Sequence, residues 1–303
     1  MNGKLFLSVI IPTYNTAALL DYTLKSIIKQ KLPRQNFEVI VCDDGSSDNS
    51  KQVVDSYRER LDIKHFFQET NGFQLARLRN IGIHQAMGDV CIFVDTGILL
   101  DEYCLSAHVN LHKGSFRSLA AIGYVLGIDL ANAVADKMEY EPRINIENAS
   151  ITIAEFEKDS AWADPRDRHY KRYNDHIESL PAPWVYFRGA NISARRQHLI
   201  DAGMFDETFK GRWGCEDNDM GFRLHKKGVK IVLCRASKSL HYPQEKGRSR
   251  ETEQGNQNCK YFLSKHNVPE IQLFLDHYKS EFTDINEILL TKNAAFSLPQ
   301  FRL

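Results

Sequence analysis

Two adjacent carboxylates, Glu216 and Asp217, follow a tryptophan and a glycine in the run W-G-C-E-D at 213–217. Asp217, Met220 and Leu224 share one face of the helix that is expected to begin here, so Asp217 should face the protein body. A partly desolvated carboxylate has a raised pKa, which suits a general base, although the positive end of the helix lowers the pKa again. Asp217 is therefore a candidate base for activating a hydroxyl group.

The acidic turn also has a purely structural interpretation. Glu216, Asp217 and Asp219 in a first helical turn would each stabilise the helix dipole by a few tenths to about 1 kcal/mol. We favour catalysis for two reasons. The preceding half of the chain has the pattern of a nucleotide-binding unit, and Trp213 offers an apolar face on which a sugar ring can stack.

About the first hundred residues alternate between β-branched runs, which predict strands, and apolar residues at helical spacing, which predict helices. The expected strands are 7–11, 37–42, 63–67 and 90–94, and the expected helices are 17–28, 49–61 and 75–87. This alternation predicts an α/β fold with a mostly parallel sheet flanked by helices. Ligands of such sheets gather at the carboxyl ends of the strands, where Asp43, Asp44 and Asp95 follow strands.

The rest of the chain is divided by changes in composition. Weak periodicity and rising charge over 128–180 predict an inserted lobe of helices and loops, which either covers an acceptor or is a solvated decoration. Beyond it, helices are expected at 195–202 and 216–227, a buried strand at 229–233, a mobile polar loop at 244–257, and a helix over the apolar positions from 271 to 278. We therefore expect one domain over 1–245, made of a nucleotide-binding half (1–115) and an acceptor-binding half (116–245), with a C-terminal extension over 246–303.

Composition excludes several classes of protein. Lysine plus arginine equal aspartate plus glutamate, at 39 each, so no global field attracts nucleic acid. No apolar run approaches the roughly 20 residues that cross a bilayer, and no secretory signal opens the sequence, so we expect a cytoplasmic protein that could attach peripherally to the inner membrane face. The six cysteines form no C-x-x-C pair. Apolar positions near the C-terminus could form a homodimer contact.

Several segments resemble the family 2 glycosyltransferases of GT-A fold. They are V-I-I-P-T-Y-N at 9–15, V-C-D-D-G-S-S-D at 41–48, A-R-L-R-N-I-G at 76–82 and F-V-D at 93–95. The similarity resumes with G-A-N-I-S at 189–193, F-D-E at 205–207 and W-G-C-E-D-N-D-M-G at 213–221. This second part is similar to the W-G-x-E-D region of chondroitin-polymerase-like and galactosyltransferase-like enzymes.

The resemblance implies a nucleotide-sugar donor and a hydroxyl-bearing acceptor. Pro12, Tyr14 and Asp44 would line the nucleoside pocket. A carboxylate at a strand end can accept the imide N–H of uracil, which is the role implied for Asp44, although the D-D-G-S run is also a plausible loop with a helix cap. Arg79 would lie near the donor, and Asp95 would be the first aspartate of the D-x-D metal motif.

The D-x-D pattern is incomplete, because Thr96 and Gly97 follow Asp95. A hard cation such as Mn²⁺ or Mg²⁺ takes about six ligands, most of which diphosphate and water can supply. Asp95 could therefore suffice together with His241, which stands where related enzymes carry a late histidine ligand. The alternative is that His241 merely closes a strand before Pro243.

Other residues would contact the two substrates. If no metal binds, Lys246 and Arg248 are candidates to neutralise the diphosphate. Helical spacing predicts that Glu216 and Asp219 point in other directions than Asp217, and the resemblance implies that they hydrogen-bond to acceptor hydroxyls.

These residues predict an inverting transfer from a nucleotide sugar, which is expected to be a UDP-sugar. In this scheme Asp217 takes a proton from the acceptor hydroxyl as that oxygen attacks the anomeric carbon. A retaining GT-A transferase and a nucleotide-sugar-binding protein without turnover remain alternatives. A dinucleotide-dependent oxidoreductase is disfavoured because no G-x-G-x-x-G follows the first strand. The sequence leaves the sugar open, and the acceptor could be a glycan, a glycolipid or a small molecule.

Overall fold

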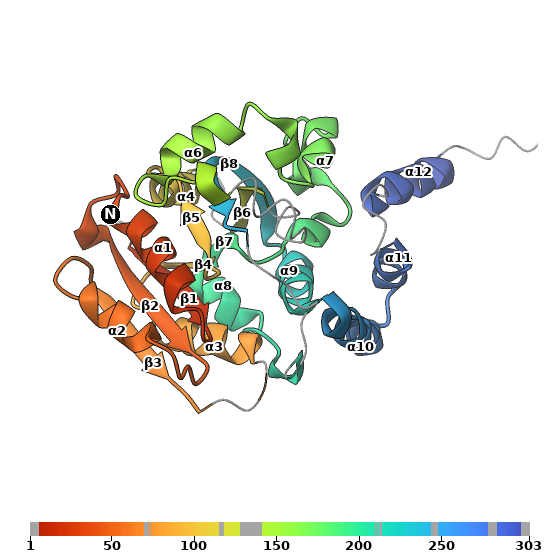
Figure 1. Cartoon of the computed structure of the whole chain (residues 1–303). Coiled ribbons are helices and arrows are strands. Elements are labelled where there is room, and N and C mark those ends of the chain that lie inside the picture. The colour runs from red at the N-terminus through yellow and green to blue at the C-terminus, as the bar shows by residue number, and fades with distance from the viewer. Residues whose placement is uncertain are drawn as a thin grey trace, which may run out of the picture.

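An eight-stranded sheet forms the centre of the protein in the computed structural model (Figure 1). The structure describes residues 6–69, 72, 74–114, 118–127, 141–209, 211, 214–243, 248–277 and 284–297. The strand order is β3-β2-β1-β4-β7-β6-β8-β5. The strands are β1 (Leu7–Thr13), β2 (Phe37–Asp43), β3 (Ile63–Phe67), β4 (Val90–Val94), β5 (Ile98–Leu100), β6 (Leu119–Leu126), β7 (Asn191–Arg195) and β8 (Lys230–His241).

The sheet is mostly parallel, as the sequence predicts. Strands β1 to β4 pair in parallel, and so do β6 and β8. Strand β7 runs antiparallel between β4 and β6, and β5 pairs antiparallel with the end of β8. The carboxyl ends of β1, β2 and β4 therefore meet at one edge of the sheet, where the candidate donor residues follow them.

Helices cover both faces of the sheet. The helices of the first half are α1 (Ala17–Ile28), α2 (Ser50–Ser56), α3 (Leu75–Gln85) and α4 (Cys104–Lys113). Because side chains alternate along a strand, Val9 and Ile11 of β1 pack in one core cluster with α1, α2 and α4, whereas Ile10 packs in the other with α3. Helices α8 (Arg196–Asp201) and α9 (Glu216–Lys226) pack in the same cluster as Ile10 and α3.

Residues 141–180 form helices and loops, as expected, but they join the main core. Helices α6 (Ala149–Phe156) and α7 (Asp167–Arg172) alternate with short 3-10 helices at Glu141–Arg143, Ser160–Trp162 and Ile177–Ser179. Phe156, Trp162 and Tyr170 are fully buried in the same cluster as the sheet and α9. Residues 128–140 of the expected lobe lie outside the described residues.

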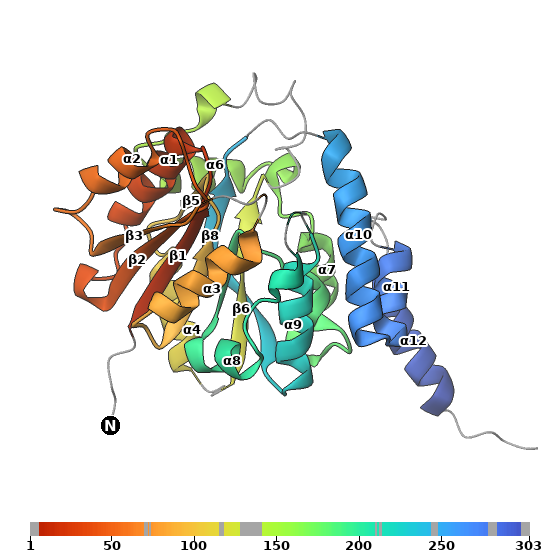
Figure 2. The same cartoon turned by 90° about the horizontal axis from the view of Figure 1, so that it is seen from below.

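The described part of the C-terminal extension is mostly helical. Helices α10 (Arg248–His266), α11 (Pro269–His277) and α12 (Ile285–Ser297) follow β8, so the expected loop at 244–257 is wrong for 248–257. The fully buried Phe262 of α10 packs 5.8 Å from Trp184 and 6.2 Å from Phe222 of α9, measured between ring centroids. Figure 2 shows α10 alongside α9. None of the helices in the described ranges is long and apolar enough to span a bilayer.

Replacing Phe262 tests whether α10 belongs to the cooperative unit. We expect Phe262→Ala to lower the free energy of unfolding by about 3–5 kcal/mol, because it leaves a cavity among aromatic rings. The exposed Lys260 provides the control, and Lys260→Ala should change stability by about 0.5 kcal/mol or less. Urea denaturation followed by far-UV circular dichroism measures both. Equal midpoints for the two variants would show that α10 unfolds independently of the sheet.

Candidate active site

A buried guanidinium joins three carboxylates at the carboxyl edge of the sheet. Arg79 of α3 is 0% exposed, and its Nη1 donates to Oδ1 of Asp217 at 2.5 Å. Its Nη2 donates to Oδ1 of Asp95 at 3.1 Å, and Nη1 lies 3.6 Å from Oε1 of Glu216. The end of β4 and the acidic turn, which are far apart in sequence, therefore open onto the same place.

Two backbone N–H groups hold the other oxygen of two of these carboxylates. Gly189 donates to Oδ2 of Asp217 at 2.7 Å, and Ala190 donates to Oδ2 of Asp95 at 3.0 Å. A Cβ atom on Gly189 would lie 2.5 Å from Nη2 of Arg79 and 3.0 Å from oxygens of both carboxylates. Only glycine fits this position without a shift of the cluster.

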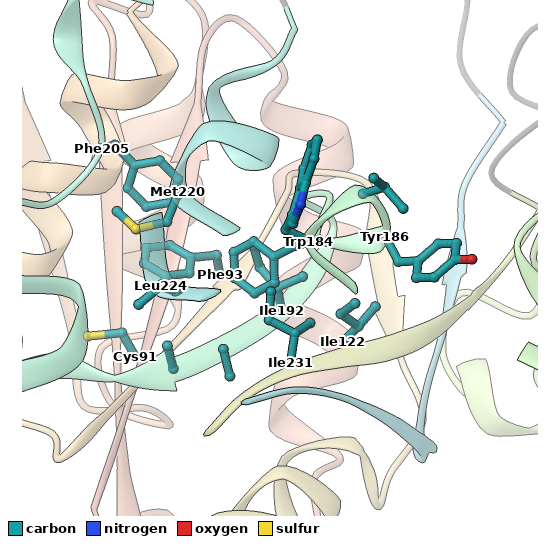
Figure 3. Close-up of a cluster of buried hydrophobic side chains, with 14 of the residues drawn as sticks. Cys91, Phe93, Ile122, Trp184, Tyr186, Ile192, Phe205, Met220, Leu224 and Ile231 are labelled. Carbon is teal, nitrogen blue, oxygen red and sulfur yellow. The ribbon is translucent and has the colours of Figure 1, made fainter. Parts of the chain in front are cut away.

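Apolar packing orients the acidic turn. Met220 and Leu224 of α9 are fully buried and lie beside Phe93 and Phe205 (Figure 3). Asp217 is on the same side of the helix, and its side chain is 14% exposed. The prediction that Asp217 faces the protein body is confirmed.

The turn before α9 is also braced from the C-terminal extension. Cys215, the N-cap of α9, has a left-handed backbone with φ of 68°. The buried Asn258 of α10 donates its amide to the carbonyl of Gly214 at 2.9 Å, and the sulfur of Cys259 lies 3.1 Å from that of Cys215. Gly214 in turn donates its N–H to Glu216 at 3.0 Å. Helix α10 thus fixes the backbone that presents the carboxylates.

Burial sets the protonation behaviour of the acidic pair. It raises the pKa of Glu216, and the neighbouring Asp217 carboxylate raises it further against the effect of Arg79. Burial also raises the pKa of Asp217, and there too Arg79 opposes the shift. Asp95 is the most open of the three, with a side chain 35% exposed. The cluster therefore combines two carboxylates of raised pKa, Glu216 and Asp217, with one that solvent can reach, Asp95.

The candidate nucleoside residues gather at the ends of β1 and β2. Tyr14 is 50% exposed just beyond β1. The carbonyl of Pro12 accepts a hydrogen bond from Oγ1 of Thr96 at 2.6 Å, which links β1 to the loop after Asp95. Asp44 is only 4% exposed, and its backbone N–H donates to Thr13 at 3.0 Å. These groups share an edge of the sheet with the carboxylate cluster.

Three expected roles do not agree with the geometry. Asp219 is fully buried on the other side of α9, where side-chain nitrogens of Arg223, Lys265 and His266 lie 2.6 to 2.8 Å from its carboxylate oxygens. It joins α9 to α10 and has no oxygen directed at an acceptor. Arg79 has no exposed surface for a donor to contact, and its hydrogen bonds go to the carboxylates that enclose it. Glu216 likewise turns inward toward Arg79 instead of away from Asp217.

The expected metal ligands, Asp95 and His241, are connected through the pairing of β5 with β8. His241 is the last residue of β8 and pairs with Ile98, the first residue of β5, while the N–H of Ile98 donates to the carbonyl of Asp95 at 3.1 Å. Nδ1 of His241 lies 3.0 Å from the carbonyl oxygen of Tyr242. Within the described residues, no group of three or more His, Cys, Asp or Glu side chains is arranged to hold a metal ion.

Some expected site residues fall outside the described part of the chain. These are Trp213 and Lys246, together with the side chain of Arg248, whose backbone begins α10. Conversely, the structure reveals four residues to which the sequence assigns no role. Gly189 and Ala190 lie in a segment that carries the family resemblance, but their use of backbone N–H groups leaves no signal in side-chain chemistry. Gln68 and Gln74, which contact Asp44, have ordinary amide side chains in a loop.

A mostly parallel sheet with candidate nucleoside-binding residues at its carboxyl edge and an acidic helix start beside that edge is the arrangement of the GT-A class of glycosyltransferase folds. Residues 8–143 match the model of glycosyl transferase family 2, and residues 169–245 match that of the N-terminal domain of galactosyltransferase. The chain is thus similar to family 2 of the glycosyltransferases over its first half and to the galactosyltransferase domain over part of its second half.

Individual proteins agree with this assignment. Validoxylamine A glucosyltransferase of Streptomyces hygroscopicus subsp. jinggangensis is 34% identical over 261 residues, which cover 86% of this chain and 61% of the relative. The chain thus spans about three fifths of the length of that relative. Staphylococcus aureus TarS 1-349 in complex with UDP-GlcNAc has a similar structure, with a TM-score of 0.61 and 20% identity over 94% of this chain and 75% of that one.

A third protein extends the structural comparison. The mannosyltransferase PcManGT of Pyrobaculum calidifontis, in complex with GDP-Man and Mn²⁺, has a TM-score of 0.60 and 18% identity over 99% of this chain and 82% of that one. At these identities the two structures show that the fold is shared.

Removing the central cation tests the cluster. We expect Arg79→Met to cost about 3–5 kcal/mol of stability near neutral pH, because three carboxylates are left without their buried partner. Without Arg79 the folded-state pKa values of Glu216 and Asp217, already raised, rise further above their unfolded values. When a carboxylate has a higher pKa in the folded state, the folded protein loses stability as pH increases from the unfolded pKa to the folded pKa. The stability deficit of Arg79→Met should therefore be larger at pH 8 than at pH 5. Urea denaturation at both values measures it.

The exposed Arg58, which pairs with Asp55, provides a matched arginine control. Arg58→Met should cost about 1 kcal/mol or less at either pH. A deficit for Arg79→Met that does not change between pH 5 and pH 8 would contradict the charge-pairing account.

Proposed function

We propose that this protein is an inverting glycosyltransferase that moves a sugar from a UDP-sugar to a hydroxyl group of an acceptor. One observation carries the proposal: Arg79 contacts both Asp95, at the donor edge of the sheet, and Asp217, at the start of α9. A donor held at the strand ends therefore has its reacting carbon beside a buried carboxylate. Such an arrangement suits direct displacement by an acceptor hydroxyl.

In the proposed reaction Asp217 is the general base. It accepts the proton of the acceptor hydroxyl as that oxygen forms a bond to the anomeric carbon, and the bond from this carbon to the diphosphate oxygen breaks on the opposite face. One displacement inverts the configuration. Arg79 and the N–H of Gly189 fix the orientation of the Asp217 carboxylate, and burial raises its pKa, which favours proton acceptance.

The donor site would be built from the strand ends. Tyr14 is exposed and available to pack on a base, Pro12 shapes the end of β1, and Asp44 is placed to accept the imide N–H of uracil. A uridine nucleotide is supported by TarS, whose fold is shared and which was found with UDP-GlcNAc. The acceptor is proposed to be a glycan, a glycolipid or a small molecule that carries a hydroxyl group.

A divalent cation is compatible with the residues present, although the D-x-D motif is incomplete. If Nδ1 of His241 donates to the carbonyl of Tyr242, the lone pair lies on Nε2, which is the form that ligates metals. Asp95 has the accessible carboxylate of the cluster. These two residues would hold Mn²⁺ or Mg²⁺, with diphosphate and water as the remaining ligands, and the ion would neutralise the leaving group. PcManGT, of the same fold, contains Mn²⁺.

Asp217→Asn tests the base. We expect its turnover to fall by about 10²–10⁴-fold, because general-base help is lost, while UDP affinity is kept. In the wild type kcat/KM should increase with pH through the raised pKa of Asp217. UDP release in the presence of an acceptor measures turnover. The exposed Asp201 provides the control, since Asp201→Asn should behave as the wild type. Wild-type turnover in Asp217→Asn would remove Asp217 from the mechanism.

Thermal shift with UDP, with and without Mn²⁺, tests the cation. A ligand at 100 times its Kd stabilises the folded state by about 2.7 kcal/mol. We therefore expect UDP to raise Tm further in the presence of Mn²⁺ than in EDTA, and His241→Ala to lose that increment while it keeps the shift from UDP alone. An equal shift in Mn²⁺ and EDTA would favour the metal-independent alternative, in which side chains such as Lys246 and Arg248 neutralise the diphosphate.

A further inference from the structure

Amide groups surround the carboxylate of Asp44. Nε2 of Gln68 donates to Oδ1 of Asp44 at 2.6 Å, and Nε2 of Gln74 donates to the same oxygen at 3.4 Å. Asp44 is 4% exposed and Gln74 is 6% exposed, so water competes little for these positions.

The number of donors limits what else Asp44 can bind. An ionised carboxylate accepts about four hydrogen bonds, two on each oxygen, and both positions on Oδ1 are already filled within the protein. Within the described residues, Oδ2 is the oxygen left for a ligand. Gln74 is the N-cap residue of α3, but its side chain makes no capping hydrogen bond to the helix. The amide of Gln74 donates to Asp44 instead.

We infer that Gln68 and Gln74 are specificity-determining residues, which restrict the base site to a base with a single ring N–H donor, such as uracil. This inference rests on the proposed nucleotide site. Uracil presents one imide N–H between two carbonyl acceptors, and it matches the one open oxygen of Asp44. Guanine presents two adjacent donors, its ring N–H and its exocyclic amine, and it needs both oxygens.

Guanine would therefore lose a hydrogen bond at this site. Either it displaces an amide of Gln68 or Gln74, or one of its own donors stays unsatisfied. The cost of a buried unsatisfied donor corresponds to about 10-fold to 100-fold in affinity. The fold itself does not decide between bases, because proteins of this fold were found with UDP-GlcNAc and with GDP-Man. Local donors such as these amides must decide.

Calorimetric titration of the whole chain with UDP and with GDP tests the inference. The wild type should bind UDP at least about 10-fold more tightly than GDP. The double variant Gln68→Leu/Gln74→Leu keeps similar side-chain volume and opens two positions on Asp44. Its preference for UDP should fall by about 10-fold or more, chiefly because GDP binds more tightly. Gln74→Leu alone should give an intermediate preference and provides the test if the double variant does not fold.

The exposed Gln272 on α11 provides the matched control, and Gln272→Leu should keep the wild-type preference. A folded double variant with the wild-type ratio of affinities would overturn the inference and leave the proposed function intact. A wild type that prefers GDP would also overturn it. A wild type that binds neither nucleotide would contradict the proposed function and the inference together.

Discussion

The site depends on the pairing of one buried cation with three carboxylates. Arg79 has no exposed surface, so its charge must be balanced within the protein. Its partners come from the loop after β4 and from the start of α9, and the segment entering β7 supplies two N–H groups to the same carboxylates. This single requirement fixes the mutual position of four elements of the sheet and its covering helices. It also explains why residue 189 is a glycine.

Much of the donor half follows from the sequence because local periodicity determines it. The helix expected at 17–28 is observed with the same bounds, and the strand at 90–94 likewise. The inward direction of Asp217 was predictable from Met220 and Leu224, which repeat at helical spacing. The role of Asp219 was not, because its partner His266 is 47 residues further along the chain. Only the tertiary structure shows that Asp219, in the same helical turn as Asp217, has a structural role.

The polar segment after β8 illustrates the same limit. Residues 248–257 are rich in charge and include a glycine, which favours a loop in isolation. They form the first half of α10 because the second half is held by Phe262 among aromatic rings and by Lys265 and His266 on Asp219. Tertiary packing of one end of a helix can outweigh weak propensity at the other. The hydrogen bonds to Asp44 were hidden for a related reason, since amide side chains carry no positional signal.

The brace from α10 has a consequence for where the functional unit ends. Sequence similarity to the galactosyltransferase model stops at residue 245, yet the amide of Asn258 supports the carbonyl of Gly214, next to the acidic turn. A chimera that joins two relatives at residue 245 would combine the acidic turn of one protein with helix α10 of the other. The natural crossover point for such exchanges lies beyond His266, where α10 ends.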